Sequence, residues 1–539
     1  MSGPPHIASP PLVVVVGAGP AGSRAALSAA RCGARVVLVD SEARARGRYE
    51  RQPAAGTDGV IASATHPLEP AVAARPRIEH LARATVWALE PGPAPGRHLV
   101  HLQQGPADDR GRPPRTLTAD ALVLCTGAFD RVLPFPGWEL PGVVTAGAAR
   151  ALAEGQRTAV GARAVVSGTG PFLLPAALSL LDVGAHVLGV YEAGNPARWL
   201  RSPAAALRDG GPGRLAELAS YAAGLARERV PYRTRHAVVA AHGRNHVEAV
   251  TVARLDAGWH PVPGSERRLA PVDAVCVGYG FTPQLELPLA AGCAVRDGHV
   301  VVDGRQATTV PGVYAAGELT GIAGARAAAA EGELAGLAAV ADLAERGWAA
   351  ASAGGAAGRA AEGAGTGLAP PPPARVAAAA GRVRSGQRFG RALARAHPVP
   401  GGWRGWLRED TLVCRCEEVS YGELRDAVVA RGADGMRALR LACRAGLGAC
   451  QGRMCGRNTA ELAAAFLGSP VADPYATDRR PLAQPVRLGD LAGPPDETAA
   501  DRDEARTGAA DGAHAGPPDA PGDVTPDVTP DPPVSPDTR

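Results

Sequence analysis

Four cysteines near the C-terminal end of the sequence have the side-chain chemistry and spacing of metal-cluster ligands. They form a Cys-x-Cys pair at Cys414 and Cys416 and a Cys-x4-Cys pair at Cys450 and Cys455. Thiolates are soft ligands that suit iron–sulfur clusters or zinc. Structural zinc sites usually leave about two to four residues between the first two ligands. The Cys-x-Cys spacing therefore favours a [2Fe-2S] cluster, with zinc or no metal as the alternatives.

The residues around these cysteines support a small ligand-binding domain. The stretch 446–452 is rich in glycine, which lets backbone N–H groups turn toward cluster sulfurs. Ser420 and Glu423 have the spacing of a capping box and predict a helix directly after the first cysteine pair. Cys443 lies in a helical pattern outside the ligand spacing, so we predict that it is not a ligand.

The N-terminal segment carries a G-x-G-x-x-G motif between a predicted strand, 12–16, and a predicted helix, 21–31. Its glycines permit a tight turn, close approach of a pyrophosphate and close helix–strand packing, and the helix N-terminus then faces the phosphates. An aspartate at the end of the next strand can accept hydrogen bonds from an adenosine ribose. The predicted cofactor-binding residues here are Gly17, Gly19, Pro20, Ala21, Gly22 and Asp40.

Two later segments indicate that this first dinucleotide is FAD. Residues 121–137 form a predicted strand that ends in a sharp turn at Thr126 and Gly127. Residues 308–336 contain a predicted strand that runs into Gly317 and Glu318, followed by a helix whose N-terminus can face a flavin. This order is typical of two-dinucleotide flavoproteins, in which a second Rossmann unit interrupts the FAD domain.

The interrupting segment, 163–193, repeats the strand–glycine–helix plan at Gly168 and Gly170. Leu173 stands in place of the third glycine of the motif. Glu192 ends the next strand and favours the 2′-hydroxyl of NAD over the 2′-phosphate of NADP. NAD(H) or another adenine nucleotide is thus one interpretation of this site, and a glycine loop kept only as scaffold is the other.

Composition excludes several other functions. The chain contains no lysine, so it has neither a Walker-type phosphate loop nor a lysine Schiff base for pyridoxal phosphate. The net charge of +4 gives no basis for nucleic-acid binding. No signal peptide or membrane span is predicted, and the nine cysteines do not form a disulfide framework, so we expect a cytoplasmic protein.

The remaining cysteines and histidines show no catalytic arrangement. No Cys-x-x-Cys lies in the flavoprotein region, which disfavours dithiol reductase chemistry. We predict that three single cysteines are small core residues and that three histidines of a polar strand-turn region are structural or solvated; they are Cys125, Cys276, Cys293, His236, His242 and His246.

The predicted fold is α/β, with two nested Rossmann-like domains followed by a small helical domain and a disordered acidic tail. The expected boundaries are 11–140 and 286–347 for the two parts of the FAD domain, 141–285 for the NAD(P)-binding-like domain, 348–404 for a linker, 405–468 for the cluster domain, 469–492 for an extension and 493–539 for the tail.

With these motifs in view, the chain resembles the flavoproteins exemplified by the A subunit of opine oxidases and the B subunit of hydrogen cyanide synthases. The most specific stretches are 126–152, the glycine pair with its LLP segment at 168–175, and the CRCEEV…AGLGACQGRMCG region. The resemblance implies a BFD-like [2Fe-2S] domain with the four cysteines of the two pairs as ligands. It also implies a partner flavoprotein subunit that oxidises an amine or amino acid, and leaves room for a small ferredoxin-like subunit.

The sequence departs from that family at the turn after its second strand. Relatives carry Gly-Gly-Gln there, whereas this chain has Arg46-Gly47-Arg48 followed by Arg51-Gln52, and the stretch 53–83 is shorter than usual. Three hypotheses follow: an electron-transfer subunit of a heteromeric amine, opine or amino-acid dehydrogenase; a self-contained NAD(P)H-dependent flavin/iron–sulfur reductase; and a non-catalytic nucleotide-binding scaffold.

Overall fold

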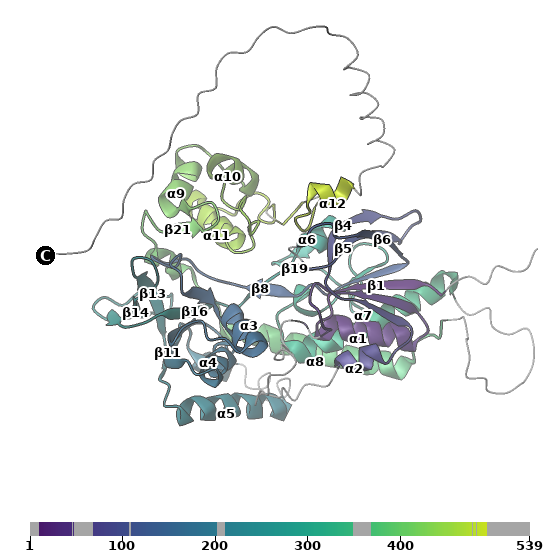
Figure 1. Ribbon diagram of the computed structural model, residues 1–539, viewed down its shortest axis with the longest axis horizontal. Coiled ribbons are helices and arrows are strands. Elements are labelled where there is room, and N and C mark those ends of the chain that lie inside the picture. Colours follow the sequence, from purple (N-terminus) through teal and green to yellow (C-terminus); the bar gives the residue numbers. More distant parts are fainter. Residues whose placement is uncertain are drawn as a thin grey trace, which may run out of the picture. The chain divides into compact units, whose positions relative to one another are not determined.

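The computed structural model describes residues 10–45, 47, 68–106, 109–201, 211–348, 368–476, 478–480 and 482–492 (Figure 1). Its first layer is a parallel sheet with the strand order β20-β7-β1-β2-β3. The central strand reads LVVVV and is buried throughout, as expected of a parallel strand that is covered on both faces. The bounds are β1 Leu12–Val16, β2 Arg35–Val39, β3 Ile78–Leu81, β7 Ala121–Leu124 and β20 Val313–Ala315.

Two different layers cover this sheet, and alternate residues of β1 face one or the other. Val13 and Val15 belong to a core shared with three helices, which lie side by side in Figure 1: α1 Pro20–Arg31, α7 Ala325–Leu343 and α8 Pro373–Ala396. Val14 and Val16 belong to a core shared with an antiparallel sheet and a short helix: β4 Ala84–Pro91, β5 His98–Gln104, β6 Pro114–Ala119 and α6 Glu286–Ala290. Helix α2, Leu68–Ala73, packs beside α1.

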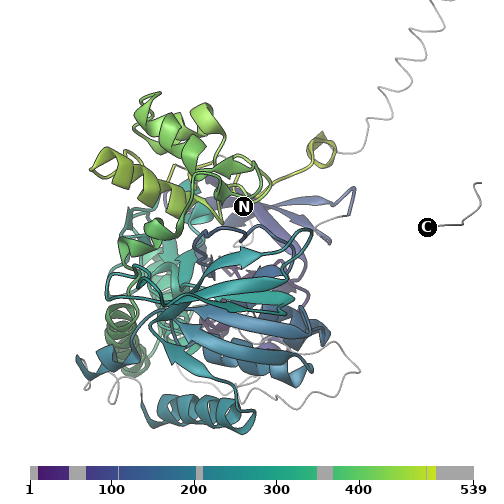
Figure 2. The same cartoon turned by 90° about the vertical axis from the view of Figure 1, so that its left-hand side faces the viewer.

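A second parallel sheet, with the order β12-β11-β10-β16-β9, repeats the Rossmann plan. An antiparallel sheet packs against it and joins its core (Figure 2). The bounds are β9 Val143–Thr145, α3 Ala146–Gln156, β10 Arg163–Gly168, α4 Leu173–Asp182, β11 His186–Glu192, η1 Pro196–Arg201, α5 Gly211–Arg227, β12 Tyr232–Thr234, β13 His236–His242, β14 Ala249–Arg254, β15 Arg267–Leu269 and β16 Ala274–Gly278.

The two Rossmann units are joined by an antiparallel pair, β8 Ala128–Asp130 and β17 Phe281–Pro283. The chain therefore leaves the first unit along β8 and returns to it along β17, which confirms the nested arrangement. Three short elements follow the return: β18 Val295–Arg296, β19 His299–Val300 and the 3-10 helix η3 Gly317–Leu319.

The segment after α7 differs from the predicted linker. Residues 373–396 form the long helix α8, and η5 Gly401–Trp406 buries two tryptophans, Trp403 and Trp406. The Ala-rich, Arg-containing sequence of this stretch favours a helix, and α8 buries one stripe of small residues against α7. The low-complexity part, 349–367, lies outside the described residues.

The C-terminal domain is small and helical. Its elements are β21 Leu412–Cys414, β22 Val419–Ser420, α9 Tyr421–Val429, α10 Met436–Cys443 and α11 Gly456–Leu467, and α12 Leu488–Ala492 follows the extension. The predicted capping box is confirmed, because Ser420 Oγ accepts from the N–H of Glu423 and the Glu423 carboxylate accepts from the N–H of Ser420. Within the described residues no helix is both long and apolar enough to span a membrane.

This helical domain shares one hydrophobic core with the second Rossmann unit. Trp138, Trp259 and Tyr279 come from the Rossmann side, and Trp406 stacks on Trp259 with ring centroids 6.4 Å apart. The indole N–H of Trp138 donates to the carbonyl oxygen of Leu412 at 2.6 Å. The cluster domain is therefore packed against the flavoprotein body instead of being tethered by a free linker.

Candidate functional site

The first glycine loop is packed so tightly that two of its positions accept only glycine. Gly17 has φ +100°, and a Cβ there would lie 2.3 Å from the carbonyl oxygen of Cys125. A Cβ on Gly22 would lie 1.7 Å from the carbonyl oxygen of Gly17. The loop is thereby held directly under the start of α1, with the close helix–strand packing that the motif predicts.

The N-terminus of α1 is open to an anion. Gly19 is the N-cap and supplies no side-chain hydrogen bond, Pro20 follows it, and the first turn carries no acidic residue. The first N–H groups of a helix have no partner within the helix, so here they are available to phosphate oxygens. Gly47 approaches this loop closely, since a Cβ on it would lie 2.6 Å from the Cα of Gly19. Its neighbours in the predicted altered turn, Arg46 and Arg48, lie outside the described residues, as do Arg51 and Gln52.

Asp40 retains unused acceptor capacity at the ribose position. One carboxylate oxygen accepts from the N–H of Ala18, and the other accepts from the N–H of Glu42 at 2.7 Å. A carboxylate offers about four lone-pair positions, so about two remain. Burial raises the pKa of Asp40, while these two N–H groups act in the opposite direction. The half-buried carboxylate fits the two hydroxyls of an adenosine ribose.

The two predicted return segments lie at the edge of the same unit. Thr126 donates its hydroxyl to the carbonyl oxygen of Gln284 at 3.1 Å, and Gly127 turns the chain into β8. Gly317 and Thr320 both donate to one oxygen of Glu331, each at 2.8 Å. The loop before α7 is therefore fixed by a carboxylate inside that helix.

Three acidic side chains gather near this loop. Burial, followed by the nearby charge of Asp130, raises the pKa of Glu318 to about 7. Burial also raises the pKa of Glu331 to about 7, against the hydrogen bonds from Thr320 and Gly317. A weakly acidic carboxyl group at Glu318 fits the hydroxyl-rich part of a bound FAD, where it can accept or donate a hydrogen bond.

The second glycine loop has lost the form of a pyrophosphate cradle. Leu173, which replaces the third glycine, is buried, and α4 begins only at this residue. By contrast, α1 begins directly after Gly19. Between Gly170 and Leu173 the chain makes tight turns instead, with the N–H of Leu173 donating to the carbonyl oxygen of Gly170 at 3.3 Å. The helix N-terminus is thus displaced along the chain from the second glycine of the motif.

Glu192, predicted to bind the ribose of a second nucleotide, is fully buried and bonded to its own chain. One carboxylate oxygen accepts from the hydroxyl of Thr169 at 2.6 Å and from the N–H of Gly194 at 2.8 Å, and the other accepts from the N–H of Gly170 at 2.8 Å. His397, at the end of α8, places its Nδ1 3.9 Å from the same carboxylate. Burial raises the pKa of Glu192, but hydrogen bonding from His397, Thr169 and Gly170 outweighs it and lowers the pKa.

The four predicted cluster ligands converge in the helical domain. The Sγ atoms of Cys455 and Cys414 lie 3.6 Å apart, and Cys450 hydrogen-bonds with both Cys455 and Cys416. Among the described residues no group of three or more His, Cys, Asp or Glu side chains is arranged to hold a single metal ion. Four thiols linked as neighbouring pairs suit a two-iron cluster, which takes two cysteine ligands at each iron.

Backbone N–H groups point at these sulfurs, as the glycine-rich sequence predicts. The hydrogen bond from Cys455, then backbone N–H groups that include Gly446, lower the pKa of Cys414 to about 6 against the effect of burial. A similar set that includes the N–H of Gly452 lowers the pKa of Cys450 to about 5. Donors of this kind stabilise negative charge on sulfur, so the donor set fits a thiolate-bound [2Fe-2S] cluster.

Cys443, which we predict not to be a ligand, ends α10 and donates to the carbonyl oxygen of Leu439 at 3.2 Å. Of the predicted core cysteines, Cys125, Cys276 and Cys293 are all buried. His236 and His242 are the two ends of β13, at a sheet edge away from the motifs.

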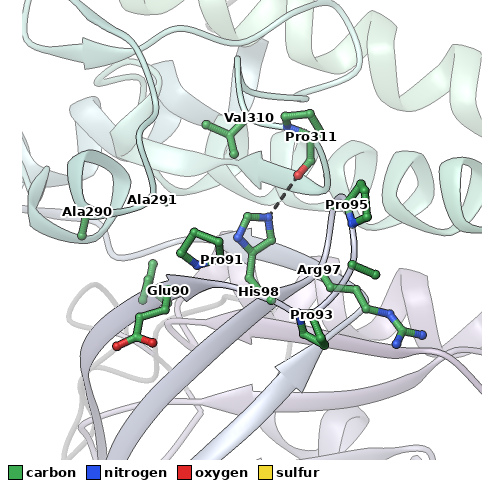
Figure 3. A pocket seen from close by; sticks show the side chains of 14 residues that line it. Glu90, Pro91, Pro93, Pro95, Arg97, His98, Ala290, Ala291, Val310 and Pro311 are labelled. Carbon is green, nitrogen blue, oxygen red and sulfur yellow. Dashed lines mark hydrogen bonds between the residues drawn. The ribbon is translucent and has the colours of Figure 1, made fainter.

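A cavity of about 430 Å³ lies at the β4–β5 hairpin, outside all of these sites (Figure 3). It is lined largely by prolines and small residues, with His98 bonded to the carbonyl oxygen of Pro311 at 3.0 Å. It includes none of the predicted site residues, so it plays no part in the site described above.

Buried ion pairs fasten the cysteine loop to the flavoprotein body. Arg453, between Cys450 and Cys455, donates to Glu286 of α6 at 2.7 Å and lies over the ring of Phe129 in β8, 5.5 Å from its centroid. A second pair joins Arg131, directly after β8, to Glu461 of α11 at 2.8 Å. The thiol cluster therefore packs beside the connecting strand that follows Gly127.

Several of these residues carry no clear sequence signal. Glu331 stands in an Ala/Gly-rich helix, where a lone acidic residue is a weak hint of a buried role. Arg453 lies between two predicted ligands, which is the one signal that could have identified it. His397 was out of reach, because its segment reads as linker and its partner Glu192 is distant in sequence.

Comparison with known proteins supports both halves of this description. The model of the pyridine nucleotide-disulphide oxidoreductase family matches residues 11–332, and that of the BFD-like [2Fe-2S] binding domain matches residues 412–465. The opine oxidase protein of Agrobacterium tumefaciens that is named as its A chain is 31% identical over 509 residues, covering 89% of this chain and 91% of that protein. Hydrogen cyanide synthase subunit HcnB of Pseudomonas aeruginosa is 31% identical over 458 residues, covering 82% and 90%.

Two further matches are more distant. The alpha chain of sarcosine oxidase from Corynebacterium sp. is 35% identical over 181 residues, which cover 32% of this chain and 19% of that protein. Among solved structures, L-proline dehydrogenase from P. horikoshii superposes with a TM-score of 0.56 at 19% identity, covering 90% of this chain and 80% of that one. This last likeness concerns the fold.

Proposed function

The chain belongs to the pyridine nucleotide-disulphide oxidoreductase family and is an FAD-dependent oxidoreductase with a BFD-like [2Fe-2S] domain, and from this premise we propose that it is the electron-transfer subunit of a heteromeric amine, opine or amino-acid dehydrogenase. One observation carries the proposal. The loop between Cys450 and Cys455 is fastened by Arg453 to Glu286 and to the ring of Phe129, on the strand that leaves the FAD domain.

Each group of residues has a distinct task in this proposal. The N–H groups at the start of α1 bind the pyrophosphate of FAD, and Asp40 accepts from the adenosine ribose. The four cysteines hold the cluster, while Arg453 fixes their loop. When bound, FAD takes up electrons in pairs, and a [2Fe-2S] cluster passes them on singly.

The partner subunit follows from the relatives and from what the site lacks. The relatives from opine oxidase and hydrogen cyanide synthase are both named as subunits, so we propose that a second flavoprotein subunit oxidises the C–N bond of the substrate. Within the described residues we find no histidine positioned as a general base beside Gly127 or Glu318. A small ferredoxin-like subunit is a further candidate partner on the electron-exit side.

The alternative of a self-contained NAD(P)H-dependent reductase has less support. It needs an open second nucleotide site, yet Glu192 is buried and bonded to Thr169, Gly170 and Gly194. The scaffold alternative needs a flavin site that cannot bind, yet Asp40 and the start of α1 keep their free acceptors and donors.

The proposal can be tested on the whole chain expressed anaerobically together with its candidate partner gene. We expect about one FAD, two irons and two sulfides per chain. We also expect that the chain copurifies with the partner and that the complex, but not the chain alone, reduces a dye with an amine or opine substrate. Flavin reduction by NADH in the isolated chain would instead establish the reductase alternative.

A further inference from the structure

The carboxylate of Glu192 has no room for a ribose. Three of its about four lone-pair positions are filled by Thr169, Gly170 and Gly194, and His397 faces what remains. A ribose diol needs two free acceptor positions at this point. Asp40 in the first unit keeps two, and it is half-buried where Glu192 is fully buried.

The hydrogen bonds of His397 define its tautomer. The indole N–H of Trp199 lies 3.1 Å from Nε2 of His397. Indole nitrogen is only a donor, so Nε2 is the acceptor and the proton sits on Nδ1. That proton points to the side of Thr169 Oγ1, at 3.5 Å, and the Glu192 carboxylate, at 3.9 Å. His397 is thus specifically oriented toward the ribose position, and its side chain is only 9% exposed.

Helix α8 carries His397 to this position by packing on both Rossmann units. Its Gly386 fits against the first unit, because a Cβ there would lie 2.6 Å from the Cβ of Ala327. One turn further, the ring of Phe389 lies 5.7 Å from that of Trp199 and 3.7 Å from the guanidinium carbon of Arg214, both from the second unit. The C-terminal half of α8 therefore covers the mouth of the second glycine loop.

The chain continues from His397 directly into the packing of the cluster domain. The N–H of Gly402 donates to the carbonyl oxygen of Gly258 at 3.0 Å, and the indole of Trp406 donates to that of Trp259 at 3.0 Å. Val413 and Cys414 then enter the same core. Whatever holds His397 in place thus also fixes the approach to the first ligand pair.

We propose that the second Rossmann unit of this chain binds its own helix α8 instead of a nicotinamide dinucleotide, with Glu192 and His397 as the positioning pair that mounts the iron–sulfur domain. The inference rests on the proposed function only in taking the mounted domain to carry the cluster. It explains why the third glycine can be Leu173: a loop that no longer receives a pyrophosphate needs no helix N-terminus beside Gly170.

Hydrogen exchange of the full-length protein tests the mount. We expect His397→Ala and Glu192→Gln to raise amide exchange over 385–406 about tenfold, the effect of losing one charge-assisted hydrogen bond. His397→Asn, which keeps a donor at the Nδ1 position, restores most of the protection. The matched control is His260→Ala, which breaks an exposed His–Asp pair of 3.1 Å with Asp256 and leaves 385–406 unchanged. Unchanged exchange in both Glu192→Gln and His397→Ala overturns the inference.

Calorimetric titration with NADH, NADPH and ADP-ribose tests the other half. We expect no saturable binding to the wild-type chain, and saturable binding of any of the three overturns the closed site. Neither readout depends on electron transfer. A protein with the mount intact but no flavin-to-cluster transfer would refute the proposed function alone, and the reverse result would refute this inference alone.

Discussion

Arg453 and Glu286 form a buried ion pair, 2.7 Å between Nε and Oε1, that joins the cysteine loop of the cluster domain to the first helix after β17. Their side chains are 14% and 4% exposed. The guanidinium also donates to the carbonyl oxygen of Ala483 at 3.2 Å, so it locks three segments together. A charge of this kind is retained where it fixes a relative position, and here that position is of the cluster to the flavin side.

Replacing Arg453 with alanine leaves the buried carboxylate of Glu286 without its closest cation. We expect a loss of about 3 kcal/mol in the free energy of unfolding, the usual order for breaking a buried pair from one side. Arg480, 4.0 Å from the same carboxylate, limits the damage. Denaturant unfolding measures it, with Arg425→Ala, an exposed pair partner of Glu409, as the control. Equal small losses in the two variants would contradict the role of Arg453.

Asp40→Asn keeps the shape of the ribose acceptor but removes its charge and replaces one acceptor with a donor. We expect the dissociation constant for FAD to rise about tenfold, which corresponds to about 1.4 kcal/mol. Reconstitution of the flavin-free protein, followed by flavin fluorescence, measures this constant. Asp256→Asn, which changes an exposed carboxylate, serves as the control. An unchanged constant in Asp40→Asn would place the ribose elsewhere.

The ligand assignment separates Cys443 from the other cysteines of its domain. Cys443→Ser should retain full iron and sulfide, because its thiol bonds to the carbonyl oxygen of Leu439. Cys416→Ser and Cys450→Ser should each lose most of the cluster, since each removes one thiolate ligand. Iron and sulfide assays with electron paramagnetic resonance distinguish these outcomes. Loss of iron in Cys443→Ser together with its retention in Cys416→Ser would require a different ligand set.

Glu331 makes the stability of the flavin-free protein depend on pH. Its pKa is raised from 4.5 to about 7, so between these values the folded state binds more protons than the unfolded state. Stability is therefore highest below pH 4.5 for this group and falls as pH rises toward 7, by up to about 3 kcal/mol. Glu331→Gln should flatten this fall in Tm, whereas Glu79→Gln, an exposed control, should leave it unchanged. A steeper fall in Glu331→Gln would reverse the sign.

The sequence predicts the elements that local pattern defines. The run of valines in β1, the glycine spacing after it and the capping box at Ser420 each specify a structure within a few residues, and all three are found. The four cysteines of the two motifs also converge, which their spacing alone made plausible.

Long-range contacts could not be predicted in this way. Helix α8 falls within the predicted linker, because an Ala/Gly/Arg stretch has no strong hydrophobic stripe and its burial depends on close approach to Ala327. The burial of Glu192 depends on that same helix, so the nucleotide prediction could not detect it. The altered turn after β2 and the predicted tail, 493–539, lie largely outside the described residues.

Direct observation of electron transfer within one chain tests the central claim most directly. A light flash that reduces the bound flavin should be followed by flavin reoxidation and by growth of the [2Fe-2S] resonance signal, at one common rate in freeze-quenched samples. Because the cluster loop is fastened beside β8, we expect a rate that is independent of protein concentration. A rate that rises in proportion to concentration, or a flavin that stays reduced while the cluster signal remains absent, would contradict transfer within the chain.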